Sequence, residues 1–518
     1  MKFQIFSENQ WIYPDTEITE QNRAELYSAR RSDVCFQILT DHYLSGNETV
    51  SAEFKLDGCD AVVYQLMTAC VPLNSHEKAL CTTDYDSVKH FVTRKAPFNV
   101  YDITRPLDEG KTESGRAAFY VRINVSSDAL VGTHECELKI NIDSESLTIP
   151  VSLKIYNATI PELKNSAFHM VNWIYYETVA QDHGVEIYSN EYMSILDGYL
   201  ENQIDMRNDF LMLPAGKPVR DESGKVIDFD FSHVEKVAMS AINHGFKYVM
   251  GGFVARFRVW NEPDIILLWD ENVTVTSIEG FRQLKIYFER ANEFIKKNGL
   301  EKNYMQCLVD EPQFQNSLTY RALSGICRKC IPGVMINDPV ESTDLAGSLD
   351  IWVVKQAVFE TYLDDYKKLQ ESGETMWIYT CGFPAGYTMN RVMDIPLVAS
   401  RLPMWMCYKY DAPGFLHWGY HLHNPEGRAD TNYHTQGVSY PAGNAHIVYP
   451  TDGKPLDSVR SHLQRAGAYD YELFAILGKK DQQKAKALIE KVCRTFDDYD
   501  FSANALDDVR HELLEAIG

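Results

Sequence analysis

Apolar and polar residues alternate over much of the first 160 positions of the chain. The alternation is clearest in 119–125, 136–142 and 147–155, where Phe, Val, Leu, Ile and Cys fill every second position. A period of two gives each strand one apolar face. Several such strands separated by turn residues predict an antiparallel β-sandwich. The segment 156–163, which contains Pro161, is the predicted linker at its end.

The pattern changes after this linker. Strand-like apolar runs now alternate with segments of helical spacing, such as 188–200 and 281–295. Eight strand–helix units over about 300 residues predict a (β/α)₈ barrel, a TIM barrel of the α/β class. The eight strand-like runs are 168–174, 209–213, 246–253, 304–309, 334–336, 351–354, 375–380 and 403–408.

The end of the chain has helical periodicity at 456–477 and 481–493, and a short helix is expected after Ser502. The sequence therefore predicts a multi-domain protein with three parts. These are a β-sandwich domain at 1–160, the barrel at 161–495 and a C-terminal helical segment at 496–518.

Charge narrows the classes of ligand. The chain of 518 residues has a formal net charge of −23, which argues against nucleic acid and anionic membranes because phosphate binding needs a basic surface. A neutral ligand fits better. The 30 Tyr, 24 Phe and 8 Trp provide enough rings both for a core and for stacking on sugars.

The cysteines and the N-terminus add two expectations. Cys327 and Cys330 form the one Cys-x-x-Cys, without a second pair or a nearby His pair, so we expect no metal and no cofactor. The first residues lack the apolar segment of a signal peptide, and no later run approaches a membrane span. These features predict a cytoplasmic protein and leave its oligomeric state open.

Asp310 and Glu311 are the most informative residues of the chain, because they follow the apolar run 304–309 and precede Pro312. Neighbouring side chains on a strand point to opposite faces, so both carboxylates reach one site only where the strand ends and bends. Proline provides that end. In a (β/α)₈ barrel, chemistry gathers at the C-terminal ends of the strands, and this pair follows the fourth. The alternative is an acidic loop cap.

Two carboxylates suggest hydrolysis of a glycosidic bond. A conventional double displacement needs a second carboxylate after strand seven, yet 374–384 has no acidic residue at the C-terminal end of its strand. Substrate assistance is the other route: a 2-acetamido carbonyl attacks the anomeric carbon, one acid holds the acetamido N–H and the other serves as acid and then base. Repulsion between adjacent carboxylates would raise the proton affinity of one of them.

Two other functions stay open. The protein could be a non-catalytic carbohydrate-binding protein on the same scaffold, or a conventional β-glycosidase with another nucleophile. Glu262 is a candidate nucleophile because Asn261-Glu262-Pro263 copies a motif of many barrel glycosidases. It follows the third strand-like run, however, within a Trp-rich loop, so a turn or rim role is the expected one.

Aromatic and polar side chains on or beside the predicted strands are candidates for binding the sugar. Trp377 and Tyr379 share one face of strand seven, with Tyr379 nearer the C-terminal end. The alternatives are a barrel-core role for the rings and satisfied buried hydrogen bonds for the polar residues. The candidates are His169, Trp173, Asn208, Trp377, Tyr379 and Trp418, with Asn172, His417 and Tyr420 beside them.

Several motifs, taken in order, resemble glycoside hydrolase family 123. They are 308–312, 377–381, 414–420, 447–460 and 465–472. The sandwich and the linker are also similar, so the resemblance spans nearly the whole chain. Two departures are the sequence 467–471, which differs from the usual Gly-Ile-Glu-Asp-Tyr, and the lack of a secretion signal.

The resemblance implies a β-sandwich, a (β/α)₈ catalytic domain and retaining exo-β-N-acetylgalactosaminidase activity by substrate assistance. Asp310 would orient and polarise the acetamido group, and Glu311 would be the acid/base. Tyr379 and Trp418 would help to form the sugar pocket. An imported oligosaccharide or a glycoconjugate would be the substrate, and the choice between galacto and gluco configuration depends on one hydroxyl group.

Overall fold

The computed structural model describes residues 1–19, 22–76, 81–82, 84–107, 112–435 and 437–518. Contacts between residues divide the chain into two compact units. The N-terminal unit comprises Met1–Phe168, Gly382–Tyr410 and Gly419–Gly518, and the barrel unit comprises His169–Cys381 and Asp411–Trp418. The domain boundaries expected at residues 160 and 495 stay a prediction.

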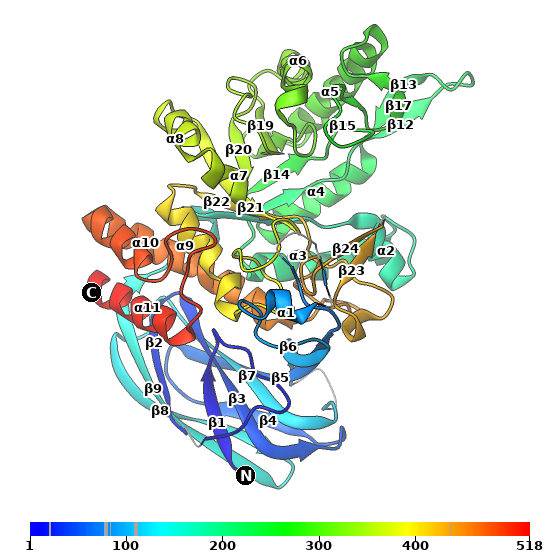
Figure 1. Cartoon of the computed structure of the whole chain (residues 1–518). Coiled ribbons are helices and arrows are strands. Elements are labelled where there is room, and N and C mark those ends of the chain that lie inside the picture. Colours follow the sequence, from blue (N-terminus) through cyan, green and yellow to red (C-terminus); the bar gives the residue numbers. More distant parts are fainter. Residues whose placement is uncertain (20–21, 77–80, 83, 108–111, 436) are drawn as a thin grey trace. The chain divides into compact units, whose positions relative to one another are not determined.

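The N-terminal unit contains the predicted β-sandwich, drawn in blue and cyan in Figure 1. Its strands pair antiparallel except for β2 and β9, which run parallel. The six-stranded sheet has the order β1 (Phe3–Ser7), β3 (Ser32–Leu44), β7 (Gly115–Val125), β5 (Cys59–Val71), β6 (Phe98–Pro106) and β25 (Asp457–Ser458). The four-stranded sheet has the order β2 (Ala24–Arg30), β9 (Glu145–Thr159), β8 (Gly132–Ile142) and β4 (Val50–Phe54).

The six-stranded sheet is buried on both faces. Phe119 and Val121 of β7 face the four-stranded sheet, whereas the intervening Tyr120 packs on the other face with Leu463. A strand covered on both sides has no need for polar residues at alternate positions. For this reason nine consecutive residues at the start of β3 are buried.

Four α-helices lie in the described part of the N-terminal unit. They are α1 (Tyr85–Val88), α9 (Leu402–Lys409), α10 (Val459–Glu490) and α11 (Ala503–Ile517). α10 breaks at Asp481, whose carboxylate accepts a hydrogen bond from Lys484 N at 2.9 Å and caps the second half. The two helical segments expected at 456–477 and 481–493 are the two halves of α10, and the short helix expected after Ser502 is α11.

The segment 460–472, which runs from the end of the motif 447–460 through the motif 465–472, has a structural role. Its charged groups are buried in the N-terminal unit, where Arg460 pairs with Asp102 at 2.9 Å and Asp470 pairs with Arg401 at 2.6 Å. Glu472 accepts a hydrogen bond from Ala167 N at 2.8 Å. Buried charges of this kind need partners, and all three have them.

The barrel unit contains eight parallel strands in one sheet, which confirms the predicted fold class (Figure 1). The strands in chain order are β10 (His169–Asn172), β11 (Phe210–Met212), β14 (Tyr248–Gly251), β18 (Tyr304–Gln306), β19 (Met335–Val340), β20 (Ile351–Lys355), β21 (Thr375–Thr380) and β22 (Gly414–His417). The helices of this unit are α2 (Tyr176–His183), α3 (Asn190–Asp205), α4 (Ser232–His244), α5 (Ile278–Lys297), α6 (Ser317–Cys330), α7 (Gln356–Thr361) and α8 (Leu363–Glu371).

The sheet curls until its two ends meet. The strand order runs from β10 through β22 and β21 round to β14 and β11. Asp209, just before β11, joins these ends: its N–H donates to Met170 O at 3.2 Å, and its carboxylate accepts from Met170 N at 3.1 Å. Where the two ends of the sheet meet, at the seam of the barrel, the hydrogen bonds of Asp209 therefore take the place of a ladder of backbone hydrogen bonds between β10 and β11.

The prediction of the eighth strand was wrong. The run 403–408 is helix α9, and the eighth strand is β22. A short apolar run has no periodicity that separates a buried strand from a buried helix. Pro403 is at the second position of α9, where a missing N–H costs nothing. The sequence pattern did not predict β22, because this strand is four residues long and begins with glycine.

Gly414 leaves room for Trp377 in the barrel core. A Cβ on Gly414 would overlap the Trp377 ring, whereas a Cβ on Gly325, in α6, would meet nothing within 4 Å. We expect Gly414→Ala to destabilise the barrel by about 1–3 kcal/mol through overpacking. Gly325→Ala should leave stability unchanged or slightly raise it.

Thermal unfolding followed by circular dichroism tests this prediction. The Tm should fall by several degrees in Gly414→Ala and not in Gly325→Ala. Equal melting of the two variants would contradict the close approach.

Candidate active site

The C-terminal end of β18 is held from both sides. Leu308 N donates to the Asp338 carboxylate at 2.8 Å, and Leu308 O accepts from Val254 N at 3.0 Å. Asp338 lies in β19, and its second oxygen accepts from Tyr320 OH at 2.7 Å. The backbone two residues before Asp310 therefore has little freedom.

The chain then turns at Glu311. Its φ of +50° lies in the left-handed region, which a residue with a side chain adopts at a cost of roughly 1–2 kcal/mol. Glu311 N donates to Pro339 O at 3.1 Å, and Glu341 N donates to Pro312 O at 3.2 Å. Two such bonds contribute about 1 kcal/mol each and offset the strain. The expected bend after strand four is present.

Glu311 lies among side chains from the ends of β20 and β21. Tyr379 OH donates to Glu311 Oε1, and Lys355 Nζ is 3.2 Å from the same oxygen. Lys355 Nζ also contacts the Glu341 carboxylate. The side chains of Lys355, Glu311 and Glu341 are only 10%, 15% and 17% exposed, so their charges interact strongly.

Asp310 is the exposed member of the pair. Although water reaches it, the protein atoms around its carboxyl group raise its pKa well above the usual range. The charge of Glu311 raises this pKa further, and Lys355 opposes the shift. The repulsion expected from the sequence is therefore present, and it favours a proton on Asp310 in the free protein.

Tyr379 is the predicted ring that reaches the carboxylates. It is buried, and desolvation followed by the Glu311 charge raises its pKa well above the usual range. The phenol therefore keeps its proton and acts as a hydrogen-bond donor. Trp377, two residues earlier on the same face, belongs to the apolar core of the barrel.

Trp173 and Trp418 follow two neighbouring strands. Trp173 comes directly after β10 and Trp418 directly after β22, and Trp173 N donates to His417 O at 3.2 Å. Both side chains are half-buried. Trp173 packs edge-on against Phe253, with ring centroids 5.6 Å apart. Both therefore lie at the end of the barrel where Asp310 and Glu311 are found.

The remaining predicted residues have structural partners. His169 begins β10, stacks on Trp377 with centroids 5.8 Å apart, and its Nδ1 lies 2.7 Å from Asp209 Oδ2. Asn208 is buried, accepts from Asn172 Nδ2 at 2.8 Å and donates to Gln203 O at 3.1 Å. These contacts favour the core alternatives for His169, Trp377 and Asn208.

Glu262 has a role in a turn. It follows the short strand β15 (Ala255–Arg256), and its carboxylate accepts from Arg258 N at 3.0 Å and Arg258 Nε at 2.9 Å. These bonds lower its pKa. A carboxylate committed to its own loop in this way is poorly placed as a nucleophile.

Sequence reasoning missed Lys355 and Glu341. Both come at the end of buried strands, Lys355 as the last residue of β20 and Glu341 directly after β19. The available signal was a single charge directly after an apolar run, which is weaker than the two adjacent carboxylates before a proline that marked Asp310 and Glu311.

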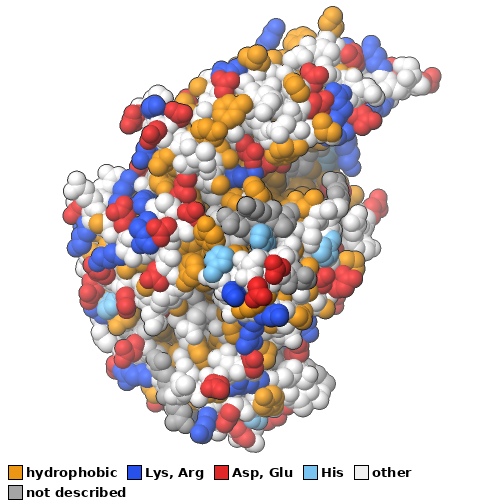
Figure 2. All heavy atoms as spheres, viewed as in Figure 1, with side chains coloured by type: hydrophobic (Ala, Val, Ile, Leu, Met, Phe, Trp, Pro, Cys, Tyr) orange, Lys and Arg blue, Asp and Glu red, His pale blue; other side chains and the backbone are white. Residues whose placement is uncertain are grey.

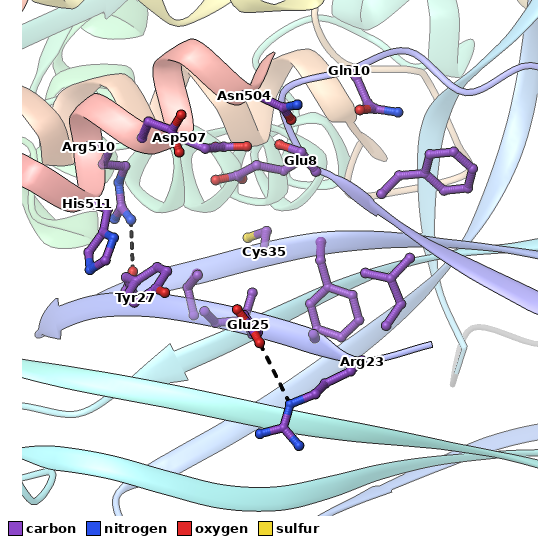
Figure 3. A pocket seen from close by; sticks show the side chains of 18 of the residues that line it. Glu8, Gln10, Arg23, Glu25, Tyr27, Cys35, Asn504, Asp507, Arg510 and His511 are labelled. Atoms are coloured by element: carbon purple, nitrogen blue, oxygen red, sulfur yellow. Dashed lines mark hydrogen bonds and ion pairs between the residues drawn. The ribbon is translucent and has the colours of Figure 1, made fainter. Parts of the chain in front are cut away.

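The N-terminal unit contains a cavity of about 890 Å³ among β1, β2, β3 and α11 (Figure 3). Two of the charged residues that line it have partners in the same unit. Arg510 bonds to Asp470 and to Tyr27 O, and Glu8 pairs with Arg401 at 2.9 Å. None of the predicted site residues lines this cavity.

Surface charge, metal-binding clusters and membrane-spanning helices can each indicate a class of ligand or partner. Acidic and basic side chains are interspersed on the face shown in Figure 2. Among the described residues, no three His, Cys, Asp or Glu side chains are grouped to hold a metal ion. No helix in the same part of the chain has the length and hydropathy to cross a bilayer.

The comparison with protein families decides the family. The profile of the glycoside hydrolase 123 catalytic domain matches residues 173–477, more than half of the chain. The chain belongs to glycoside hydrolase family 123. This confirms the resemblance found in the sequence, and the protein is a glycoside hydrolase with a carbohydrate substrate. No curated protein matches the chain.

One solved structure supports the fold. A family 123 glycoside hydrolase from Clostridium perfringens, described in a study of glycolipid glycan hydrolysis, has a TM-score of 0.75 at 14% identity, over 99% of this chain and 97% of that one. An endo-β-1,4-mannanase from Thermotoga petrophila has a TM-score of 0.39 at 12% identity, over 60% of this chain and 78% of that one. The first comparison supports the fold over the whole chain.

The contact between Tyr379 and Glu311 generates a prediction. Tyr379→Phe removes one donor to a charged acceptor, a bond worth about 1.5–3 kcal/mol, so glycoside hydrolysis should fall by roughly ten-fold or more. Tyr366→Phe is the matched control, because the hydroxyl of this buried tyrosine has no partner among the described residues.

Steady-state kcat/KM for both variants provides the measurement. A loss in Tyr379→Phe with an unchanged Tyr366→Phe is the expected result. Equal kcat/KM in Tyr379→Phe and wild type would contradict a role for this hydroxyl.

Proposed function

We propose that the protein releases terminal β-linked N-acetylgalactosamine, or a related 2-acetamido sugar, by a retaining, substrate-assisted mechanism. The observation that carries the proposal is the turn at Asp310-Glu311, which brings two adjacent carboxylates to the end of the fourth strand. The end of strand seven supplies Tyr379 instead of a carboxylate. A double displacement would need a nucleophile there.

In the first step, the acetamido carbonyl oxygen attacks the anomeric carbon as the bond to the leaving oxygen breaks. Glu311 gives its proton to that leaving oxygen. Asp310 accepts the acetamido N–H, which orients the carbonyl and stabilises the positive charge that develops on the oxazolinium ring. The aglycone then leaves as an alcohol.

In the second step, the Glu311 carboxylate takes a proton from water as the water oxygen attacks the anomeric carbon. The ring opens and the acetamido group is restored. Two inversions at one carbon give overall retention. Glu311 has regained its proton and the cycle is complete.

The raised pKa of Asp310 fits this division once the substrate is considered. In the free protein, desolvation and the Glu311 charge favour the protonated form of Asp310. An acetamido N–H donated to Asp310 stabilises its ionised form. Substrate binding therefore favours the ionised form of Asp310, which the proposed mechanism needs.

Trp173 and Trp418 are the proposed faces for the sugar, because both follow barrel strands at the end where the carboxylates lie. His169, Asn208 and Trp377 have a supporting role at most, given their contacts within the core. The glycolipid substrate named for the Clostridium perfringens relative makes a glycan on a larger aglycone a reasonable class to test.

The substrate preference and the role of Glu311 can be tested together. Wild type, Glu311→Gln and Asp310→Asn are compared on nitrophenyl β-N-acetylgalactosaminide, β-N-acetylglucosaminide and β-galactoside. Wild type should cleave the acetamido sugars and leave the plain galactoside intact. Loss of the acid/base should reduce kcat/KM by about 10²- to 10⁴-fold.

A thiazoline analogue of the acetamido sugar tests the intermediate. It should inhibit wild type far more strongly than the free sugar does, because it mimics the cyclised species. Three results would oppose the mechanism: cleavage of plain galactoside, covalent labelling by a 2-fluoro sugar, or azide rescue of Asp310→Ala that yields a glycosyl azide of inverted configuration.

A further inference from the structure

Lys355 connects the candidate acid/base to a third carboxylate. Its Nζ lies 3.2 Å from Glu311 Oε1 and contacts Glu341 Oε1. Gln313 Nε2 donates to the other oxygen of Glu341 at 3.3 Å. Both oxygens of Glu341 are thus engaged, so Glu341 fixes the ammonium group beside Glu311.

We infer that Lys355 and Glu341 are positioning residues that set the pH at which Glu311 gives up its proton. The inference rests on the proposed function, in which Glu311 is the acid and base. An ammonium group 3.2 Å away stabilises the carboxylate form of Glu311. Glu341 limits this effect, because its negative charge neutralises much of the Lys355 charge.

The charges around Glu311 explain why such a pair is useful. Four groups face it: Asp310 from its own turn, Glu341 after β19, Lys355 from β20 and Tyr379 from β21. Together they place three carboxyl groups around one ammonium group. Repulsion would then hold the proton too firmly for transfer to a leaving oxygen, and Lys355 opposes that tendency.

The contacts also assign the two oxygens of Glu311. The hydroxyl of Tyr379 and the ammonium group of Lys355 both reach Oε1. An oxygen that accepts two donors is a poor position for a further proton. The transferable proton therefore belongs on Oε2, and Oε1 is the oxygen whose growing negative charge is stabilised as that proton leaves.

The pH dependence of kcat/KM on the acetamido substrate tests the inference. Its alkaline limb reports loss of the last proton of the Asp310–Glu311 pair from the free enzyme. Lys355→Met should move this limb upward by about 1 unit or more, since a neighbouring opposite charge is removed. Glu341→Gln should move it downward, because the Lys355 charge is then no longer neutralised.

Two further variants separate charge from structure. Lys355→Arg retains the charge and should restore the limb toward that of wild type. Lys297→Met removes an exposed lysine that pairs with Glu235 at 2.8 Å and should leave the limb in place. A purely structural role would lower activity in Lys355→Met and Glu341→Gln without moving the limb in opposite directions, and that result would overturn the inference.

A second readout does not depend on turnover. NMR of isotope-labelled glutamate carboxyl carbons, assigned with Glu311→Gln, follows the titration of Glu311 directly. Its midpoint should rise in Lys355→Met and fall in Glu341→Gln. If wild type cleaves none of the three glycosides, the proposed function fails, while this titration still supports or overturns the charge pair.

Discussion

The left-handed backbone at Glu311 turns the chain directly after Asp310, and the proposed site with two adjacent carboxylates depends on this turn. Without it, Asp310 and Glu311 would point to opposite faces of the same strand, as the pleat requires. The conformation is unfavourable by itself and persists because the neighbouring chain determines it. Strain of this kind is typical of functional sites, where surrounding structure offsets its cost.

β19 provides most of that support. Three of its residues or neighbours act in sequence: Asp338 binds the backbone before the turn, Pro339 accepts from Glu311 N, and Glu341 both bonds to Pro312 O and contacts Lys355. β19 and the residue after it therefore fix the backbone of the turn at Glu311 and contribute to the charge around it. A rigid strand can hold this geometry more closely than a loop could.

The sequence was informative where pattern and chemistry coincide. The alternation at 119–125 identified a buried strand, and the carboxylates before Pro312 identified the end of the fourth barrel strand. It was uninformative where a residue's role depends on a distant partner. His169 is at the start of its strand and Tyr379 is near the C-terminal end of its strand, and this position decides which of them reaches Glu311. The role of Lys355 depends on its contact with Glu341, which is distant in the sequence. The eighth strand was missed because four residues are too few to show a period.

The seam of the barrel has a consequence for the timing of synthesis. β10 pairs with β22, and His169 lies opposite Gly414. β10 therefore cannot form this pairing until Gly414, about 245 residues later in the chain, has been synthesised. At 5 to 20 residues per second, the ribosome needs roughly 12 to 50 s to supply that partner. Until then, the edge of β10 that pairs with β22 in the folded barrel lacks its partner strand. An unpaired strand edge is a template for pairing with another chain, so this edge is exposed to mispairing until the last strand of the barrel has been made.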